Sequence, residues 1–289
     1  MTPGNHLRQI LHRPGIRIAP AVYDCLGAIV AEQVGFDLVF SGGFGISASR
    51  LGKPDLGYMT ATEMVAAARD IAAATGLPVI ADMDTGYGNP LNVIRTVEEV
   101  VRAGVGGIIL EDQVWPKRCG HMEGKQVIGC AEHVEKIAAA RFAAADSGLV
   151  IVARTDARAD LGIEEAIHRG RRYLDAGADV LFVEAPQTRE ELALVADRFP
   201  SDHLFANIIE GGRTPNLSAM ELERMGYKIV VFALSGLFAA TEALQKCFTH
   251  LKNQGSTHGL THTMDFRAFE KVIDLGRHQE WERRFRVKG

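Results

Sequence analysis

Short apolar runs rich in β-branched residues recur at intervals of roughly 25 to 35 residues, and an alanine-rich amphipathic stretch follows most of them. This alternation predicts βα units, because buried parallel strands read as continuous apolar runs and the helices that cover them have a 3.6-residue period. Eight such strands without a long interruption favour a single α/β domain, a closed (β/α)8 or TIM barrel, over an open doubly wound sheet. The predicted strands lie near Ile16–Ala19, Leu38–Ser41, Pro78–Asp82, Gly107–Asp112, Val150–Arg154, Val180–Glu184, Leu204–Ile208 and Lys228–Ala233.

Good helix formers fill the stretches between these strands. Several of the stretches end in glycine, which favours a helix C-terminus. The predicted helices include Ala61–Thr75, Val93–Ala103, Ala131–Ala145, Glu164–Ala176 and Arg189–Arg198.

Two segments depart from this rhythm. Gln113–Gly129 joins the fourth strand to its helix through seventeen residues, longer than a usual βα connection, so we expect a mobile or functional loop there. After Lys252, the polar segment Asn253–Thr263 is predicted to be a linker and Phe266–Phe285 an added amphipathic helix. The expected organisation is a catalytic barrel over residues 1–252 and an oligomer-forming linker and helix over residues 253–289.

The composition limits the classes of function. With 289 residues, 47% of them hydrophobic, the chain is long enough for one large core. Its formal net charge of −4 at pH 7 leaves no basic excess for a nucleic acid or a membrane surface, so a small molecule is the expected partner. No apolar run approaches the roughly 18 residues of a membrane span, and no signal-peptide core is present, so we expect a soluble, cytoplasmic protein.

The four cysteines, at positions 25, 119, 130 and 247, are too few and too scattered for a disulfide framework. None forms a CxxC pair, so free thiols in a reducing compartment are expected. Cys25, Cys130 and Cys247 are assigned to packing.

The fourth cysteine has a different setting, in the segment Lys117-Arg118-Cys119-Gly120-His121. Two cations and a histidine beside a thiol predict that the pKa of Cys119 is depressed. On a glycine-rich loop over the barrel mouth, Lys117, Cys119 and His121 are candidates for a gated acid, base or nucleophile. The alternative is an exposed basic loop with an incidental cysteine.

Acidic residues end several of the predicted strands. In a barrel the carboxyl ends of the strands converge on one site, and buried carboxylates repel each other unless a cation holds them. Hard oxygen ligands select Mg²⁺ or Mn²⁺ rather than zinc. The alternative is that each acid is the N-cap of the following helix. The acidic residues are Asp82, Asp84, Glu111, Asp112, Asp156 and Glu184.

Small residues follow the second strand, in Ser41–Gly45. Gly43–Ala48 fits a loose dinucleotide fingerprint, but that fingerprint opens directly into a helix, whereas Ser49–Asp55 is expected to continue as a loop. Small residues here bring backbone N–H groups close to a substrate carboxylate. The alternative is a turn that needs glycine only for its geometry.

Two further polar residues end predicted strands. Arg154 supplies a bidentate donor for a carboxylate, and Asn207 can contact another substrate oxygen. Alternatively, Arg154 only bridges neighbouring acids inside the barrel. His133 lies on a predicted helix and is expected at the surface.

The chain contains, in this order, SGGFGISASRLGKPDLG, ADMDTGYGN, EDQVWPKRCGHMEGK, ARTDA, FVEAP and NIIEGGRTP. Together these segments resemble the isocitrate lyase and phosphoenolpyruvate mutase superfamily over about 200 residues, from Ser41 to the last predicted strand. The KRCGH, ADMD and EDQ motifs are the specific part of the resemblance. Within the superfamily it is nearest to the branch of 2,3-dimethylmalate lyase, methylisocitrate lyase and oxaloacetate hydrolase.

The resemblance implies a barrel that binds a divalent metal ion and holds substrate carboxylates beside it. Members of the superfamily generate a metal-bound enolate or aci-carboxylate. The metal ligands implied are Asp82, Asp84 and Glu111, with Asp55 contributing through water. The substrate-binding residues implied are Ser41, Gly42, Gly43 and Arg154, and Asn207 and Tyr23 complete the set of candidates.

In the lyase branch the loop cysteine, here Cys119, protonates the carbon released by cleavage, and Glu184 is the candidate to orient or relay that proton. Phosphonate-forming members typically lack this cysteine, so the KRCGH loop favours C–C over P–C chemistry. The resemblance also implies a homotetramer, a dimer of dimers that exchanges its last helices, which gives a use for Phe266–Phe285.

The predicted activity is metal-dependent retro-aldol cleavage of a 2-hydroxy dicarboxylate or tricarboxylate, of the substituted-malate or methylisocitrate type, to a 2-oxo acid and a carboxylate. Ala233 stands where relatives commonly have proline, near the distal group of the substrate. The alternatives are hydrolysis or decarboxylation of oxaloacetate, carboxyphosphonoenolpyruvate- or phosphonopyruvate-type P–C chemistry, and a catalytically silent barrel that binds a ligand.

Overall fold

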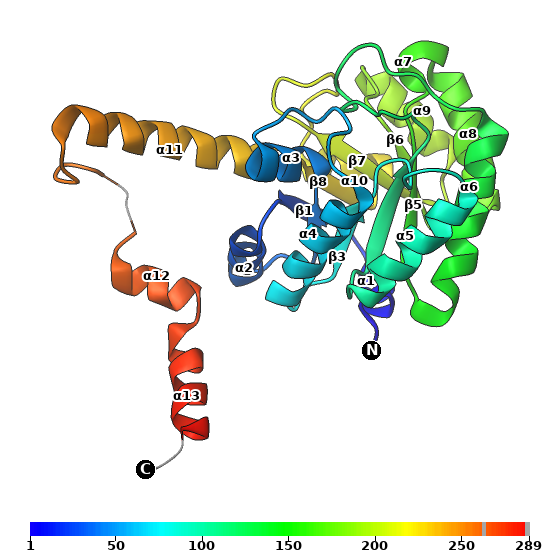
Figure 1. Cartoon of the computed structure of the whole chain (residues 1–289). Helices are drawn as coiled ribbons and strands as arrows, with labels where there is room; N and C mark the ends of the chain where they lie inside the picture. The colour runs from blue at the N-terminus through cyan, green and yellow to red at the C-terminus, as the bar shows by residue number, and fades with distance from the viewer. Residues whose placement is uncertain (262–263, 287–289) are drawn as a thin grey trace. The chain divides into compact units, whose positions relative to one another are not determined.

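Eight parallel strands close into a barrel in the order of the sequence, because β8 pairs with β1 as well as with β7. The computed structural model describes residues 1–261 and 264–286. Figure 1 shows the strands surrounded by the helices that connect them, so the predicted (β/α)8 barrel is confirmed. The strands are β1 Arg17–Val22, β2 Val39–Ser41, β3 Val79–Asp82, β4 Gly107–Glu111, β5 Val150–Thr155, β6 Val180–Val183, β7 His203–Ile208 and β8 Ile229–Phe232.

Several helices begin where the sequence supplies capping residues. Thr60 and Asn89 each form a capping box at the start of a helix, and Pro90 occupies the first turn of the second one. That helix therefore begins three residues before the predicted Val93. The helices of this part are α1 Pro3–His12, α2 Cys25–Val34, α3 Gly43–Leu51, α4 Ala61–Ala74, α5 Pro90–Arg102, α6 Cys130–Ala144, α7 Arg158–Leu161, α8 Ile163–Asp175, α9 Arg189–Arg198 and α10 Ala219–Met225, with a short 3₁₀ helix at Ala145–Ser147.

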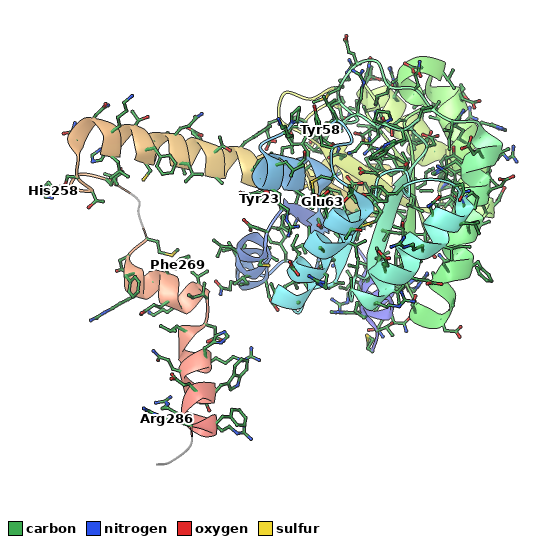
Figure 2. All side chains as sticks on the ribbon, viewed as in Figure 1. Tyr23, Tyr58, Glu63, His258, Phe269 and Arg286 are labelled. Atoms are coloured by element: carbon green, nitrogen blue, oxygen red, sulfur yellow. The ribbon has the colours of Figure 1, made fainter. Side chains whose placement is uncertain are left out.

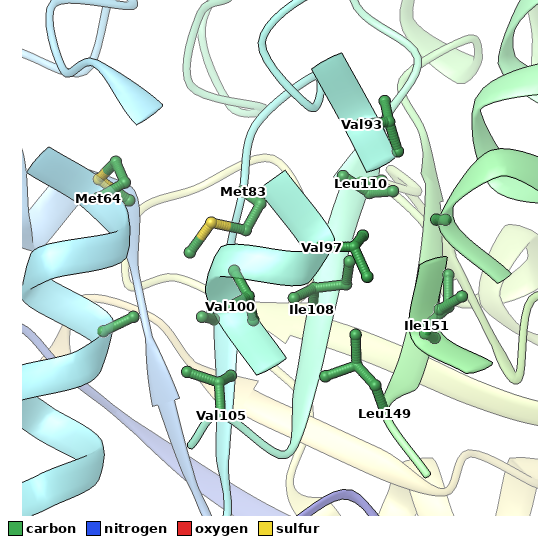
Figure 3. Packing of buried hydrophobic residues seen from close by; sticks show 14 of the residues in the cluster. Met64, Met83, Val93, Val97, Val100, Val105, Ile108, Leu110, Leu149 and Ile151 are labelled. Atoms are coloured by element: carbon green, nitrogen blue, oxygen red, sulfur yellow. The ribbon is translucent and has the colours of Figure 1, made fainter. Parts of the chain in front are cut away.

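A buried cluster holds β4 against the helices that cover it. Val93, Val97 and Val100 recur at helical spacing along α5 and belong to the same cluster as Ile108 and Leu110 of β4 (Figure 3). Each of these side chains is fully buried, and such burial contributes about 1.5 to 3 kcal/mol per residue. This packing fixes the strand that ends in Glu111.

The segment after β2 corrects one prediction. α3 begins directly after Gly42, so Ser49–Leu51, expected to be loop, are helical. The helix ends at Gly52, whose positive φ of 61° suits a left-handed C-cap. Glycine and serine have low helix propensity, but the fully buried Ile46 anchors this helix in the core.

His133 corrects a second prediction, because it is fully buried rather than at the surface. It lies on the buried face of α6, and its ring meets the ring of Tyr173 edge-on with 4.6 Å between centroids. Burial, together with the charges of Lys136 and Arg169, lowers the pKa of His133 to about 3. The sequence does contain an indication that His133 is buried, because it shares one helical face with Ile137, Ala140 and Ala144.

Acid should therefore destabilise the protein partly through this side chain. An unfolded histidine gains a proton near pH 6.5, whereas folded His133 stays neutral down to about pH 3. Its contribution to stability is present above pH 6.5 and is lost as pH falls, by about 1.4 kcal/mol per pH unit. We expect the free energy of unfolding, measured by urea denaturation between pH 7 and pH 4.5, to fall less steeply for His133→Leu. Parallel slopes for the two proteins would contradict this account.

The chain divides into two units, Met1–Leu237 and Phe238–Gly289. α11 (Ser235–Gln254) begins in the first and continues into the second, which also contains α12 (Phe266–Val272) and α13 (Leu275–Phe285). The single helix predicted over residues 266–285 is wrong. It is interrupted where Asp274 adopts a positive φ of 52°, a conformation that does not continue a helix.

The predicted linker, residues 253–263, begins later than expected because α11 continues to Gln254. Residues 262–263 of that segment lie outside the described residues. The boundary after residue 252 stays a prediction. Within the described ranges, no helix is both long enough and apolar enough to span a bilayer.

Candidate active site

A cleft lies at the carboxyl ends of the barrel strands. Phenylalanines of β2, β6 and β7 form part of its apolar surface, together with Val231 and Ala233. Its polar residues come from several strand ends, from the loop between α3 and α4 and from the loop between β4 and α6. Predicted site residues that line it are Gly42, Gly43, Asp55, Asp82, Cys119, Arg154, Glu184 and Asn207.

The other predicted residues are not among those that line the cleft. Tyr23, labelled in Figure 2, follows β1. It packs against Gly45 of α3, where an added Cβ would lie 2.8 Å from the Cβ of Tyr23. Ser41 is buried at the end of β2, and its hydroxyl has no hydrogen-bond partner among the described residues. The remaining members lie beside the lining residues: Asp84, Glu111 and Lys117 are buried, and His121 is half-buried.

The three predicted metal ligands are not helix caps. Asn89 caps α5 and Gly129 precedes α6, so the N-cap alternative is wrong for Asp82, Asp84 and Glu111. The backbone N–H of Asp84 donates to Oδ1 of Asp82 over 3.1 Å, which joins two of the acids. As the side chains stand, the described residues contain no group of three acidic, histidine or cysteine side chains that could hold a metal ion. The ligand set stays a prediction.

Lys117 supplies positive charge to two of the acids. Its ammonium lies 2.7 Å from Oδ1 of Asp55 and 2.8 Å from Oδ1 of Asp84, and the side chain is 3% exposed. Burial alone would lower the pKa of Lys117, but the attraction of Asp84 and Asp55 raises it well above the ordinary value. Burial raises the pKa of Asp84 to about 6 in spite of Lys117, and the hydroxyl of Tyr87 donates to its other oxygen.

Glu111 has fewer hydrogen-bond and ion-pair partners than Asp84 to offset the cost of its burial. It is fully buried, and neither carboxylate oxygen accepts a hydrogen bond from the described residues, although Nη1 of Arg154 lies 3.2 Å from Oε2. Burial raises the pKa of Glu111 well above its ordinary value, against the opposing effect of Arg154. The site therefore contains more buried carboxyl groups than its own cations pair, and burial favours the neutral form of Glu111.

Arg154 bridges neighbouring acids and also lines the cleft, and its binding of a substrate carboxylate stays a prediction. Nε and Nη2 donate to the two oxygens of Asp156 over 2.9 and 3.0 Å. Its remaining partners are Glu111 and, at 3.6 Å, Glu184. Asp156 thus fixes the plane of the guanidinium, while one edge faces the other acids of the cleft.

Cys119 corrects a third prediction. Burial raises the pKa of its thiol to about 11, and the charges of Asp55 and Glu184 act in the same direction, against Arg154 and a backbone hydrogen bond at His121. The neighbouring cations do not lower this pKa, because Lys117 is paired with carboxylates and Arg118 is exposed. The alternative of an exposed loop is also wrong, since Lys117 is buried and Cys119 lines the cleft.

His121 connects the loop to Glu184. Its Nδ1 accepts a hydrogen bond from the backbone N–H of Arg213 over 2.9 Å, so the neutral ring carries its proton on Nε2. Nε2 lies 3.5 Å from Oε1 of Glu184, and the amide of Asn207 lies at the same distance from that oxygen. Burial lowers the pKa of His121, which favours the neutral ring. Sequence reasoning did not assign a role to Arg213, although NIIEGGRTP contains it.

A closed parallel barrel with buried acids, an arginine and a loop cysteine around one cleft is the arrangement of a (β/α)8 enzyme. The family model described as phosphoenolpyruvate phosphomutase matches residues 7–252. The chain belongs to the phosphoenolpyruvate mutase/isocitrate lyase superfamily, as its sequence motifs predicted, and it is an enzyme of the carbon–carbon lyase type.

Among similar proteins, 2,3-dimethylmalate lyase of Eubacterium barkeri is 44% identical over 99% of both chains. Carboxyvinyl-carboxyphosphonate phosphorylmutase of Arabidopsis thaliana is 45% identical over 96% of this chain and 83% of its own. Among solved structures, oxaloacetate acetylhydrolase bound to 3,3-difluorooxalacetate has a TM-score of 0.93 and 36% identity, covering 98% and 96%. Phosphonopyruvate hydrolase bound to oxalate and Mg²⁺ has a TM-score of 0.88 and 29% identity, covering 99% of each chain.

Proposed function

We propose that the protein cleaves the carbon–carbon bond of a substituted malate, giving a 2-oxo acid and a carboxylate. The observation that carries the proposal is that Cys119 lines the same cleft as Arg154 and Glu184, with a pKa of about 11. A thiol with this pKa keeps its proton at neutral pH, as a general acid must. The arginine supplies a place for the carboxylate of the fragment that the thiol protonates. The relationship to a named 2,3-dimethylmalate lyase supports this reaction.

The lining of the cleft favours a dicarboxylate with apolar substituents over a tricarboxylate. Arg154 is the one cationic side chain among the described residues that line it. A third carboxylate would be desolvated there without a cation of its own, at a cost of several kcal/mol. The apolar surface, which includes Phe182, Val231 and Ala233, instead suits methyl or other alkyl groups.

The N-terminus of α3 is the proposed binding site for the second carboxylate of the substrate. The N–H of Gly43 lies 3.3 Å from Oδ2 of Asp82, so this helix N-terminus already faces negative charge. The unpartnered hydroxyl of Ser41 is a further donor at the same strand end. A Cβ on Gly43 would lie 3.0 Å from the Asp82 carboxylate, so glycine leaves the backbone open to a ligand.

Mg²⁺ or Mn²⁺ is the proposed metal, with Asp82, Asp84 and Glu111 as its ligands and Asp55 contributing through water. The excess of buried carboxyl groups and the unpartnered oxygens of Glu111 fit a divalent cation, and all the donors are hard oxygens. A related phosphonopyruvate hydrolase binds oxalate and Mg²⁺. When bound, the metal would stabilise negative charge that develops on the substrate oxygens.

Mg²⁺ together with oxalate should raise the melting temperature by roughly 5 °C at concentrations about a hundredfold above the dissociation constant. Glu111→Gln should lose most of this shift, because the amide supplies a weaker and uncharged ligand. Differential scanning calorimetry with and without the metal measures both proteins. An equal shift in Glu111→Gln would remove this residue from the proposed ligand set.

Glu184 is the proposed relay for the proton of Cys119. In the cleavage direction the substrate hydroxyl gives its proton to a base and becomes the carbonyl of the 2-oxo acid as the carbon–carbon bond breaks, and the thiol gives its proton to the released carbon. The resulting thiolate regains a proton through Glu184 from solvent, which also receives the hydroxyl proton from the base, so the reaction has no net uptake of a proton. The amide of Asn207 donates to Oε1 of this carboxylate over 3.5 Å, and Nε2 of His121 lies 3.5 Å from the same oxygen. Nη2 of Arg154, the proposed partner of the substrate carboxylate, lies 3.6 Å from it.

The C-terminal unit is the proposed oligomerisation element of a dimer of dimers. Among the described residues, none of α11, α12 or α13 is buried. Many large apolar side chains of this unit are exposed, and such surfaces mark sites of protein–protein interaction. Sedimentation velocity tests the proposal, and a monomer at micromolar concentration would reject it. The large exposed apolar residues are Phe238, Leu244, Phe248, Met264, Phe266, Phe269, Ile273, Trp281 and Phe285.

A substrate panel tests the reaction. Purified enzyme with Mg²⁺ is offered malate, alkyl-substituted malates, methylisocitrate, oxaloacetate and phosphonopyruvate, and the products are followed by ¹H and ³¹P NMR. The proposal expects a 2-oxo acid and a carboxylate from an alkyl-substituted malate at the highest kcat/KM. Oxalate and acetate from oxaloacetate as the dominant products would instead favour hydrolysis of oxaloacetate. The solved structure of oxaloacetate acetylhydrolase is similar in fold to this chain.

A further inference from the structure

The loop between β4 and α6 is tied down around its cysteine. The side-chain amide of Gln113 donates one hydrogen bond to the backbone of Arg118 and accepts another from it, which closes the turn between these two residues. The backbone N–H of Cys119 donates to the carbonyl of Asp55 over 3.1 Å. These bonds fix the first half of the loop, but none of them connects it to the strand that carries the substrate-binding arginine.

Lys125 makes that connection. Its side chain is 2% exposed, and its ammonium donates to the carbonyl of Gly120 and, over 2.9 Å, to Oδ1 of Asp156. A buried ammonium is costly unless it is paired, so this side chain is stable here only while the loop lies against β5. Lys125 does not line the cleft, so a direct role in the reaction does not explain its position.

The carboxylate that receives Lys125 is the same one that orients Arg154. Asp156 accepts two hydrogen bonds from the guanidinium, and its own backbone N–H is held by Oδ1 of Asp112 over 2.8 Å. One rigid carboxylate therefore positions Arg154 from one side and, through Lys125, the backbone of Gly120 from the other. Gly120 is the residue that follows Cys119.

We infer that Lys125 is a positioning residue: by joining Gly120 to Asp156, it sets the place of the Cys119 thiol relative to Arg154. This inference rests on the proposed function for its catalytic consequence, because thiol and arginine must act on one substrate. Its structural consequence is independent of the reaction. Without the ammonium, the loop loses its buried attachment to β5 and Cys119 becomes more accessible.

The test compares Lys125→Met, which keeps the length of the side chain without its charge, with Lys125→Gln, which keeps a donor. The control Glu123→Gln lies in the same loop, but its side chain is 90% exposed. Alkylation of Cys119 by iodoacetamide is timed by peptide mass spectrometry, with Cys25 as the internal reference. We expect alkylation of Cys119 to be roughly 10- to 100-fold faster in Lys125→Met, less accelerated in Lys125→Gln and unchanged in the control.

A folded Lys125→Met with wild-type alkylation of Cys119 would overturn the inference, even if its turnover were impaired. Where Lys125→Met fails to fold, the same comparison is decided by Lys125→Gln. If the wild-type protein cleaves no substituted malate, the proposed function fails, while the alkylation rates still report on the attachment. Where it does cleave one, kcat should fall in the order wild type, Lys125→Gln, Lys125→Met.

Discussion

Replacing Cys119 by serine is expected to lower kcat by about 10²- to 10⁴-fold while KM stays within a few-fold of the wild-type value. A serine hydroxyl has nearly the size of the thiol but is a far weaker acid, so it cannot deliver a proton to the leaving carbon at a useful rate. Substrate binding should persist, because Arg154 and the start of α3 are unchanged. Steady-state kinetics on the best substituted malate measures both constants.

Cys130→Ser is the matched control for this prediction. Cys130 is half-buried at the start of α6, beyond the other end of the same loop, and does not line the cleft. It should retain wild-type kcat. Normal turnover in Cys119→Ser would remove the thiol from the reaction and leave the proton donor to another group.

Gly120→Ala should be almost as damaging, for a steric reason. A Cβ at this position would overlap the carboxylate of Glu184 and crowd the guanidinium of Arg154, so the loop cannot lie where it does. Displacing a catalytic group by about 1 Å can cost a factor of roughly 10². We therefore expect kcat/KM to fall by at least about 100-fold, with the melting temperature close to that of the wild type.

Gly129→Ala provides the comparison, because an added Cβ there meets no atom within 4 Å and its φ of −57° suits alanine. This variant should behave as the wild type in the same assay. Comparable losses in Gly120→Ala and Gly129→Ala would mean that loop flexibility, rather than contact with Glu184, controls the rate.

The barrel and the location of the site were accessible from the sequence for a physical reason. Buried parallel strands must be apolar throughout, so the polar residue that ends each run marks the catalytic edge. Asp82, Arg154, Glu184 and Asn207 were found in this way, and all of them line the cleft.

The electrostatics of the site were not accessible. The pKa of Cys119 depends on where its charged neighbours point, and Lys117 points to Asp55 and Asp84 instead of the thiol. Sequence proximity cannot reveal that choice. The same limit applies to Lys125, whose partner Asp156 is 31 positions away along the chain.

Predictions about two helices and one buried histidine were wrong, each for a local reason. α3 forms in spite of its glycines because burial of Ile46 outweighs their low propensity. The helix predicted over residues 266–285 is interrupted because Asp274 adopts a left-handed conformation. The spacing of apolar residues does not predict such a conformation at a single position. His133 was misplaced because its polarity was given more weight than its position on the apolar face of α6.

The central claim is that this cleft cleaves a substituted malate to a 2-oxo acid and a carboxylate, and that a group that exchanges with solvent protonates the released carboxylate fragment. Its most direct test is to run the reaction of the best substituted malate in D₂O and analyse the products by NMR. The account predicts equal amounts of 2-oxo acid and carboxylate, with one deuterium on the carbon of the carboxylate that had carried the broken bond. Unchanged substituted malates, alongside release of oxalate and acetate from oxaloacetate, would contradict it.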